Sequence, residues 1–362
     1  MRTTLSFCAS GLVGSLAAAV AAADVAPAYT ATLITSRAAR DFWTIADNGF
    51  AVGSGSVEVN GTQRTVPGFW TPGAGFQPVF PDDPTFGSLV DVTRRRDSVG
   101  NRGDDWFVRL QDGQFAPLNP LDPGDDGLRI DAFNNRTVAI GNSSNFDDAD
   151  RLTVWQRQGF DTWTPREVPN APQTRFVRAT DLSNGFDAVG TYSDAGEPNR
   201  AFLLEDLLSS SPRLIDLGTL GGGDAQANAI NERGQIVGTS SNATGAQRAF
   251  VWTTADGMTQ LGDLGISSSF AAAYALNDNG IIVGQYGPRA TIWDADGSAF
   301  DLNDLLATPI QGSLVQAEAI NDEGLIIART RGGQGVYLLT PIPAPGTLAL
   351  LGLAPLMVRR RR

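Results

Sequence analysis

One ten-residue motif recurs along the chain and constrains the fold more than any other feature. It reads Ala-Ile-Asn-x-x-Gly-x-Ile-Val-Gly, and its three clearest copies are Ala229–Gly238, Ala275–Gly284 and Ala319–Ala328. In a repeat of this kind each unit is one supersecondary element that cannot bury its apolar face alone. The chain is therefore expected to fold as an array of similar units.

Four weaker copies of the motif lie upstream of these three. They are Thr44–Gly53, Asp91–Gly100, Ala132–Gly141, where Thr137 replaces the turn glycine, and Thr180–Gly190, which we read with one extra residue. The seven copies end at intervals of 41 to 49 residues. This near-constant spacing predicts seven structural units.

The residues of the motif predict a tight hairpin turn in each unit. Asparagine at the first turn position and glycine at the fourth are typical of a type I turn closed by a left-handed residue. The clearest turn residues are Asn231, Gly234, Asn277, Gly280, Asn321 and Gly324. Two further strands follow, such as Arg248–Trp252 and Met258–Leu264. Four short strands in about 45 residues favour a β-propeller blade, with an open β-repeat solenoid as the alternative.

The two ends of the repeat region predict how a ring would close. The last unit ends with the third-strand segment Gly335–Leu339 and has no fourth strand, whereas Tyr29–Ile34 is a strand without a unit. Pairing these segments would complete the seventh blade and remove two exposed edges. We therefore predict a seven-bladed propeller within a single domain at residues 24–340.

The first 23 residues and the last 22 are not part of this domain. Residues 1–23 contain one arginine, an apolar stretch and a run of alanines, the pattern of a secretory signal peptide cleaved after Ala23. They include Cys8, the only cysteine, so the mature chain has no thiol chemistry. Residues 341–362 hold an apolar stretch too short to span a bilayer, followed by arginines, which predicts transient contact with the inner membrane.

Two family resemblances follow from these segments. The tail PAPGTLALLGLAPLMVRRRR resembles the PEP-CTERM sorting signal, with Ala344 where that signal usually has glutamate. The resemblance implies a sorting motif at Pro343, Ala344, Pro345, Arg359, Arg360, Arg361 and Arg362. It also implies an exosortase-like processing enzyme as partner, in a bacterium that secretes exopolysaccharide. The succession LIDLGTLGGG, AINERGQIVG and RAFVW is similar to the HAF family of extracellular repeats, which implies export but no chemistry.

The composition excludes several function classes. The chain has no histidine and no lysine, so it has no Ser-His-Asp triad, imidazole base or Schiff-base lysine. A formal net charge of −12 disfavours nucleic acid as a partner. Carboxylate chemistry remains, but acids such as Asp216, Asp263 and Asp304 recur at equivalent repeat positions and are expected to be structural. We assign no catalytic residue.

Two acidic loops and three tryptophans break the repeat and are the candidates for a local site. The loops offer oxygens for calcium, although not at the alternating spacing of known calcium loops. Their acids are Asp122, Asp125, Asp126, Asp147, Asp148 and Asp150. Four tryptophans share one strand position and are expected in the core: Trp70, Trp155, Trp252 and Trp293. Three others lie outside that register and are candidate contact residues: Trp43, Trp106 and Trp163.

Three functions remain open at this point. The first is a non-catalytic propeller at the cell surface or in the exopolysaccharide matrix that presents loops to polysaccharide or surface proteins. The second is a carboxylate-based polysaccharide hydrolase or lyase, which would need two acids about 5–9 Å apart. The third is a purely structural repeat protein that associates with itself. No cofactor other than calcium is expected.

Overall fold

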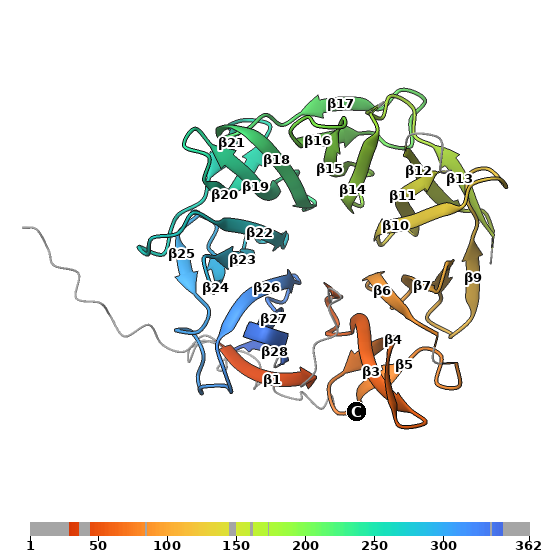
Figure 1. Ribbon diagram of the computed structural model, residues 1–362, viewed down its shortest axis with the longest axis horizontal. Helices are drawn as coiled ribbons and strands as arrows, with labels where there is room; N and C mark the ends of the chain where they lie inside the picture. The colour runs from red at the N-terminus through yellow and green to blue at the C-terminus, as the bar shows by residue number, and fades with distance from the viewer. Residues whose placement is uncertain are drawn as a thin grey trace, which may run out of the picture.

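The chain forms seven four-stranded antiparallel sheets arranged as blades around a central channel (Figure 1). This computed structural model describes residues 29–35, 44–83, 85–144, 150–159, 162–172, 174–333 and 335–342. The seven-bladed propeller expected from the repeat is confirmed, and the open solenoid is wrong. Within the described ranges, no helix has the length and apolar character needed to cross a membrane.

The blades follow one another along the chain, each beginning with its innermost strand. Blade 1 comprises β2 (Thr44–Ile45), β3 (Ala51–Val59), β4 (Thr62–Thr71) and β5 (Gly75–Pro78). Blade 2 comprises β6 (Gly87–Val92), β7 (Ser98–Arg102), β8 (Asp105–Arg109) and β9 (Phe115–Leu118). Blade 3 comprises β10 (Gly127–Phe133), β11 (Val138–Ser144), β12 (Arg151–Arg157) and β13 (Trp163–Glu167). Blade 4 comprises β14 (Phe176–Leu182), β15 (Ala188–Ser193), β16 (Arg200–Glu205) and β17 (Arg213–Asp216).

The remaining blades have the same order. Blade 5 comprises β18 (Gly221–Ile230), β19 (Ile236–Asn242), β20 (Gln247–Thr253) and β21 (Gly257–Gln260). Blade 6 comprises β22 (Ala271–Leu276), β23 (Ile282–Tyr286), β24 (Arg289–Trp293) and β25 (Ala299–Asp301). Blade 7 comprises β26 (Leu314–Ile320), β27 (Ile326–Thr330), β28 (Val336–Pro341) and β1 (Tyr29–Thr35), and a short 3-10 turn, Arg331–Gly333, precedes β28.

The ring closes through the predicted pairing of its two ends. Strand β1 lies antiparallel to β28, with Tyr29 opposite Pro341 and Thr32 opposite Leu338. The backbone N–H of Tyr29 also donates to the carbonyl of Leu305, at the outer side of blade 6. Closure therefore uses both blade 7 and its neighbour, and it covers the edge that β28 would otherwise expose.

The motif turn adopts the same conformation in all seven blades. Its fourth residue has a positive φ in every copy: Gly49, Arg96, Thr137, Phe186, Gly234, Gly280 and Gly324. Thr137 takes the place of the glycine, as predicted. The copy in blade 4 has no extra residue, because Phe186, at φ 70°, and not Gly185, closes that turn. Three blades thus hold a left-handed turn without glycine, at a cost in backbone strain.

The tryptophans that share a register pack between blades. Trp70, Trp155, Trp252 and Trp293 are all buried, and each joins an apolar cluster with residues of the preceding blade. Trp163 is also buried, 3% exposed, and packs on Phe133, so its prediction as a contact residue is wrong. Trp43 lies outside the described residues. Of the two candidates that the structure describes, Trp106 is the one that stays partly exposed.

Candidate functional site

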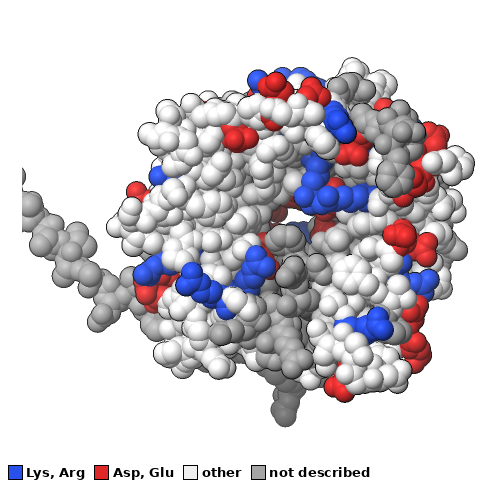
Figure 2. All heavy atoms as spheres, viewed as in Figure 1, with Lys and Arg blue, Asp and Glu red and all other residues white. Residues whose placement is uncertain are grey.

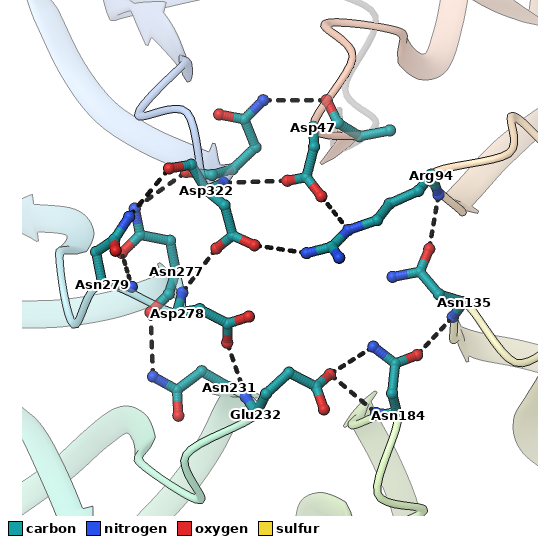
Figure 3. A network of polar contacts seen from close by, with 12 residues as sticks. Asp47, Arg94, Asn135, Asn184, Asn231, Glu232, Asn277, Asp278, Asn279 and Asp322 are labelled. Atoms are coloured by element: carbon teal, nitrogen blue, oxygen red, sulfur yellow. Dashed lines mark hydrogen bonds and ion pairs between the residues drawn. The ribbon is translucent and has the colours of Figure 1, made fainter.

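One end of the central channel is surrounded by a ring of seven polar side chains (Figure 3). Each comes from the second position of a motif turn: Asp47, Arg94, Asn135, Asn184, Glu232, Asp278 and Asp322. From Arg94 round to Asp322, each backbone N–H donates to the side-chain oxygen of the next blade, over 2.6 to 3.1 Å. The blades are therefore joined in one direction around this ring.

Arg94 completes the ring because its side chain is a donor and not an acceptor. Its Nε contacts Asp47 and its Nη2 lies 2.7 Å from Asp322. The motif asparagines add a second set of bonds, since Nδ2 of Asn231 donates to the carbonyl of Asn277 in the next blade. These contacts give the ring a structural role. They also explain why the motif keeps asparagine, which the turn alone does not require.

Two partly buried aspartates lie just behind the ring, where most blades have alanine. Asp91 and Asp181 each accept two backbone N–H groups, one from their own strand and one from the next blade, Phe133 and Ile230. Burial raises the pKa of Asp91 to about 7, and the charge of Asp181 adds to this rise. Burial raises the pKa of Asp181 to about 6. Both acids are partly buried, and each of their oxygens accepts a backbone N–H, which gives them a role in linking the blades.

The channel wall next to this ring has a repeated irregularity of the innermost strands. Strands β6, β10, β14, β18, β22 and β26 each contain a β-bulge three residues before the motif turn. The bulged residues are Val90, Asp131, Thr180, Asn228, Tyr274 and Glu318. They differ in every blade while their neighbours keep the repeat. The bulge is thus the place where the inner wall varies.

Two arginines converge on one of these bulged residues. Nε of Arg129 and Nε of Arg178 lie 2.8 and 3.0 Å from the same oxygen, Oδ1 of Asp131. The side chain of Asp131 is only 3% exposed, whereas both arginine side chains are 51% exposed. Burial raises the pKa of Asp131, and the two guanidinium groups oppose that rise. The buried carboxylate therefore orients two guanidinium groups toward solvent.

A cavity of about 890 Å³ lies between blades 2 and 3. Its apolar wall includes Trp106 and a cluster in which Phe80 stacks on Phe115 at 4.8 Å and contacts the edge of Phe107 at 5.4 Å. Arg102 lies over the ring of Phe80. The cavity thus combines aromatic planes with polar groups, as small-molecule and sugar sites do.

The opposite wall of this cavity is the first acidic loop of the sequence prediction. Asp125 is almost fully buried and binds Arg151, which also contacts Asp122 at 2.6 Å. Trp155 fixes the start of the loop, since its Nε1 donates to the carbonyl of Asn119. Asp125 and Asp126 line the cavity. Two loop acids are therefore already paired with an arginine.

Calcium at the acidic loops stays a prediction. Asp147 and Asp148 lie outside the described residues, and Asp150 lies at another cavity. Across the described part of the chain, no group of three or more acidic side chains converges in a way that could hold a metal ion. The sorting motif, Pro343 to Pro345 and Arg359 to Arg362, and the signal segment also lie outside the described residues.

A second cavity, of about 340 Å³, opens at the arginine end of the channel. Arg178, Phe176 and Tyr192 contribute to its lining, and Phe176 is 50% exposed. Arg129 lines both this cavity and the larger one. We call the two cavities that meet at Arg129 the trough. Figure 2 shows basic side chains beside the central opening, over the sheets that contain β10 and β14.

Sequence reasoning found part of the trough and missed the rest. Trp106 and the acidic loop were found because they interrupt the repeat. Arg129, Arg178 and Asp131 were missed because each occurs in a strand that otherwise follows the repeat. An alignment of the seven units on the motif turn would have pointed to them. The residue types just before the repeated alanine differ from blade to blade, and they differ most at the bulge.

No protein-family model matches the chain, and no curated protein sequence matches it. Solved structures do resemble it. A streptogramin B lyase structure has 10% identity and a TM-score of 0.52, and the match covers 87% of this chain and 98% of that one. A catalytically inactive His-to-Ala variant of virginiamycin B lyase from Staphylococcus aureus, solved with quinupristin, has 10% identity and a TM-score of 0.51 over 87% and 99% of the chains. This chain has no histidine.

A third similar structure comes from a study of two prolyl endopeptidases. It has 14% identity and a TM-score of 0.52, and the match covers 88% of this chain but 48% of that one. At these identities the similarity shows the fold alone. Activity has to be argued from the residues of this chain.

Proposed function

We propose that this protein is an extracellular, non-catalytic β-propeller that binds polysaccharide in the trough. The observation that carries the proposal is the larger cavity, where Trp106 and the Phe80–Phe115 stack lie beside polar side chains. Sugars present apolar C–H faces and rings of hydroxyl groups, so they bind where aromatic planes and hydrogen-bonding groups occur together. Two cavities that share the lining residue Arg129 offer more than one place of contact, which suits a polymer better than a single small molecule.

The position of Trp106 supports a binding role over a packing role. It pairs with Asn101 in the place where blades 4, 5 and 6 have the buried alanines Ala201, Ala249 and Ala290. Blades 3 and 7 have Leu152 and Val336 in this place, and Trp106 also packs against the apolar cluster between blades 2 and 3. A tryptophan is nevertheless larger than the residue that any of these blades has there. A partly exposed tryptophan in a place that alanine fills elsewhere is best explained by contact with a ligand.

The environment of the acidic side chains supports a binding role without catalysis. Asp91 and Asp181, the two acids with strongly raised pKa, are partly buried and have both oxygens bonded to backbone N–H groups. No observation favours the hydrolase or the self-associating alternative in particular.

Replacement of Trp106 tests the proposal directly. Trp106→Ala restores the residue type of three other blades, so the fold should persist while affinity for polysaccharide falls by about tenfold, as expected when an aromatic contact of 1–2 kcal/mol is lost. Binding is measured on a glycan array and by calorimetry, with and without calcium. Phe300→Ala, which removes an exposed aromatic of β25 outside the trough, is the control. Equal binding by both variants, or no binding by the parent, contradicts the proposal.

We propose further that the protein is exported from a bacterial cell and sorted through its tail by an exosortase-like membrane enzyme. The signal-peptide pattern of residues 1–23 and the PEP-CTERM-like tail support this export and sorting. The exported protein should begin at Asp24, and replacing Arg359–Arg362 with glutamine should leave it in the membrane fraction with its tail attached. Intact mass spectrometry of the fractions checks both. An exported chain that retains residues 1–23 would contradict the proposal.

A further inference from the structure

The arginine end of the trough has donor groups that the fold does not use. Arg129 and Arg178 each contact Asp131 through Nε, and among the described residues their terminal nitrogens make no hydrogen bond. A guanidinium group has four N–H bonds on its terminal nitrogens, which can bind two oxygens of a carboxylate or of another oxyanion. The two side chains are half-exposed and held by one buried acid, so they are oriented before any ligand arrives.

The surroundings of the pair fit a sugar that carries such a carboxylate. The same cavity is lined by Phe176, Tyr192 and the amides of Gln226 and Asn228. Asp150 is the other acid at this cavity, and Arg129 and a hydrogen bond from Ser144 oppose the rise of its pKa on burial. The cavity therefore offers aromatic surface, amide groups and two guanidinium groups within one space.

We propose that Arg129 and Arg178 bind the carboxylate of a uronic acid residue, so that the ligand of the trough is an acidic polysaccharide. This inference rests on the proposed function and names its substrate class. The net charge of the chain, −12, repels polyanions over most of the surface. An acidic polymer can therefore bind only where positive groups are locally presented. The trough has two such groups in Arg129, which lines both cavities, and Arg178, which lines the smaller one.

The other blades indicate which substitutions the fold tolerates. Arg178 pairs with Thr191 at the position where Gln226 pairs with Thr239 and Gln316 pairs with Arg329. Arg129→Gln and Arg178→Gln thus introduce a residue that the same strand position already has in blades 5 and 7. Arg213→Gln is the matched control, since Arg213 lies on β17 and pairs with Glu205 outside the trough.

The test compares polygalacturonate with its fully methyl-esterified form, which has the same sugars without the charge. The parent should bind polygalacturonate at least about tenfold more tightly, and the double variant Arg129→Gln/Arg178→Gln should lose that difference, as expected for a charge-assisted hydrogen bond. Arg213→Gln should behave as the parent. Dextran sulfate carries sulfate groups that a guanidinium group can also bind through two oxygens, so it tests whether the arginines select a carboxylate. We expect it to bind more weakly than polygalacturonate.

Each outcome separates this inference from the proposed function. Equal affinity of the parent for the acidic and esterified polymers, unchanged in the double variant, overturns the inference and leaves polysaccharide binding intact. Dextran sulfate bound as tightly as polygalacturonate, with the same dependence on the arginines, overturns the assignment to carboxylate. Binding of none of the polymers, with Trp106→Ala like the parent, overturns the proposed function itself. Circular dichroism confirms that every variant is folded.

Discussion

At the scale of single residues, the propeller uses the same position for different purposes. The position before the last residue of the inner strand is alanine in four blades, Ala132, Ala229, Ala275 and Ala319, and aspartate in two, Asp91 and Asp181. The aspartates accept backbone N–H groups from the next blade. Where the other blades have a small apolar alanine, the two aspartates form a hydrogen bond to the next blade, and this bond is sensitive to protonation of the carboxylate.

The two aspartates predict a stability that declines as the pH rises. Because burial raises their pKa in the folded state to about 7 and about 6, the folded chain binds more protons than the unfolded chain above a pH near 4. The contribution of these two groups to the free energy of unfolding should therefore be largest below pH 4 to 5. It should fall as the pH rises toward 7. Each pKa unit corresponds to about 1.4 kcal/mol.

Asp91→Ala isolates this contribution. The variant should be less stable than the parent at pH 5, because the N–H of Phe133 loses its acceptor, and the deficit should shrink by about 1 kcal/mol or more at pH 8. Urea unfolding of both proteins at the two pH values measures it. A deficit that is the same at pH 5 and pH 8 would show that Asp91 has an ordinary pKa.

At the scale of the structural element, the motif hairpin is the unit that the sequence predicts best. Its turn depends on a left-handed residue, and at Gly234, with φ 73°, an added Cβ would meet no atom within 4 Å. A substitution there is limited by the backbone conformation and not by crowding. Gly234→Val should cost about 1 kcal/mol or more, since a β-branched residue rarely adopts a positive φ.

A second variant, Gly234→Asn, distinguishes the cost of backbone strain from the cost of replacing glycine by any other residue. Gly234→Asn should cost much less than Gly234→Val, because asparagine tolerates the left-handed region. Thermal unfolding of the two variants beside the parent gives the comparison. If Gly234→Val has the melting temperature of the parent, or if both variants lose the same stability, the hairpin assignment is wrong.

Strand pairing within a blade could be predicted because the turn fixes its register, and the apolar alternation fixes which face is buried. The bulge at Asp131 could not be predicted, since one extra residue changes no composition and leaves the repeat in phase. The burial of Trp163 also could not, because it depends on Phe133 from another strand of the blade. Sequence showed where the repeat is broken, but the meeting of Trp106 and Arg129 on one trough required the fold.

At the scale of the whole molecule, closure divides the surface into two ends with different chemistry. The end formed by the motif turns is linked around the ring from Arg94 to Asp322, so its polar groups are mostly engaged with one another. The other end presents guanidinium groups and open cavities. The hydrogen bonds that join the blades are formed at the end with the motif turns. Residues at the opposite end can therefore differ between blades, and the trough lies at that end.

The location of the bound polymer is the central claim, and amide hydrogen exchange of the mature protein with and without polygalacturonate tests it most directly. Binding in the trough should slow exchange in the segments that line it, residues 101–107, 125–129 and 176–180. The motif turns at residues 277–280 and 321–324 should be unchanged. Protection confined to those turns, or no protection at a polymer concentration that saturates binding, would contradict the account.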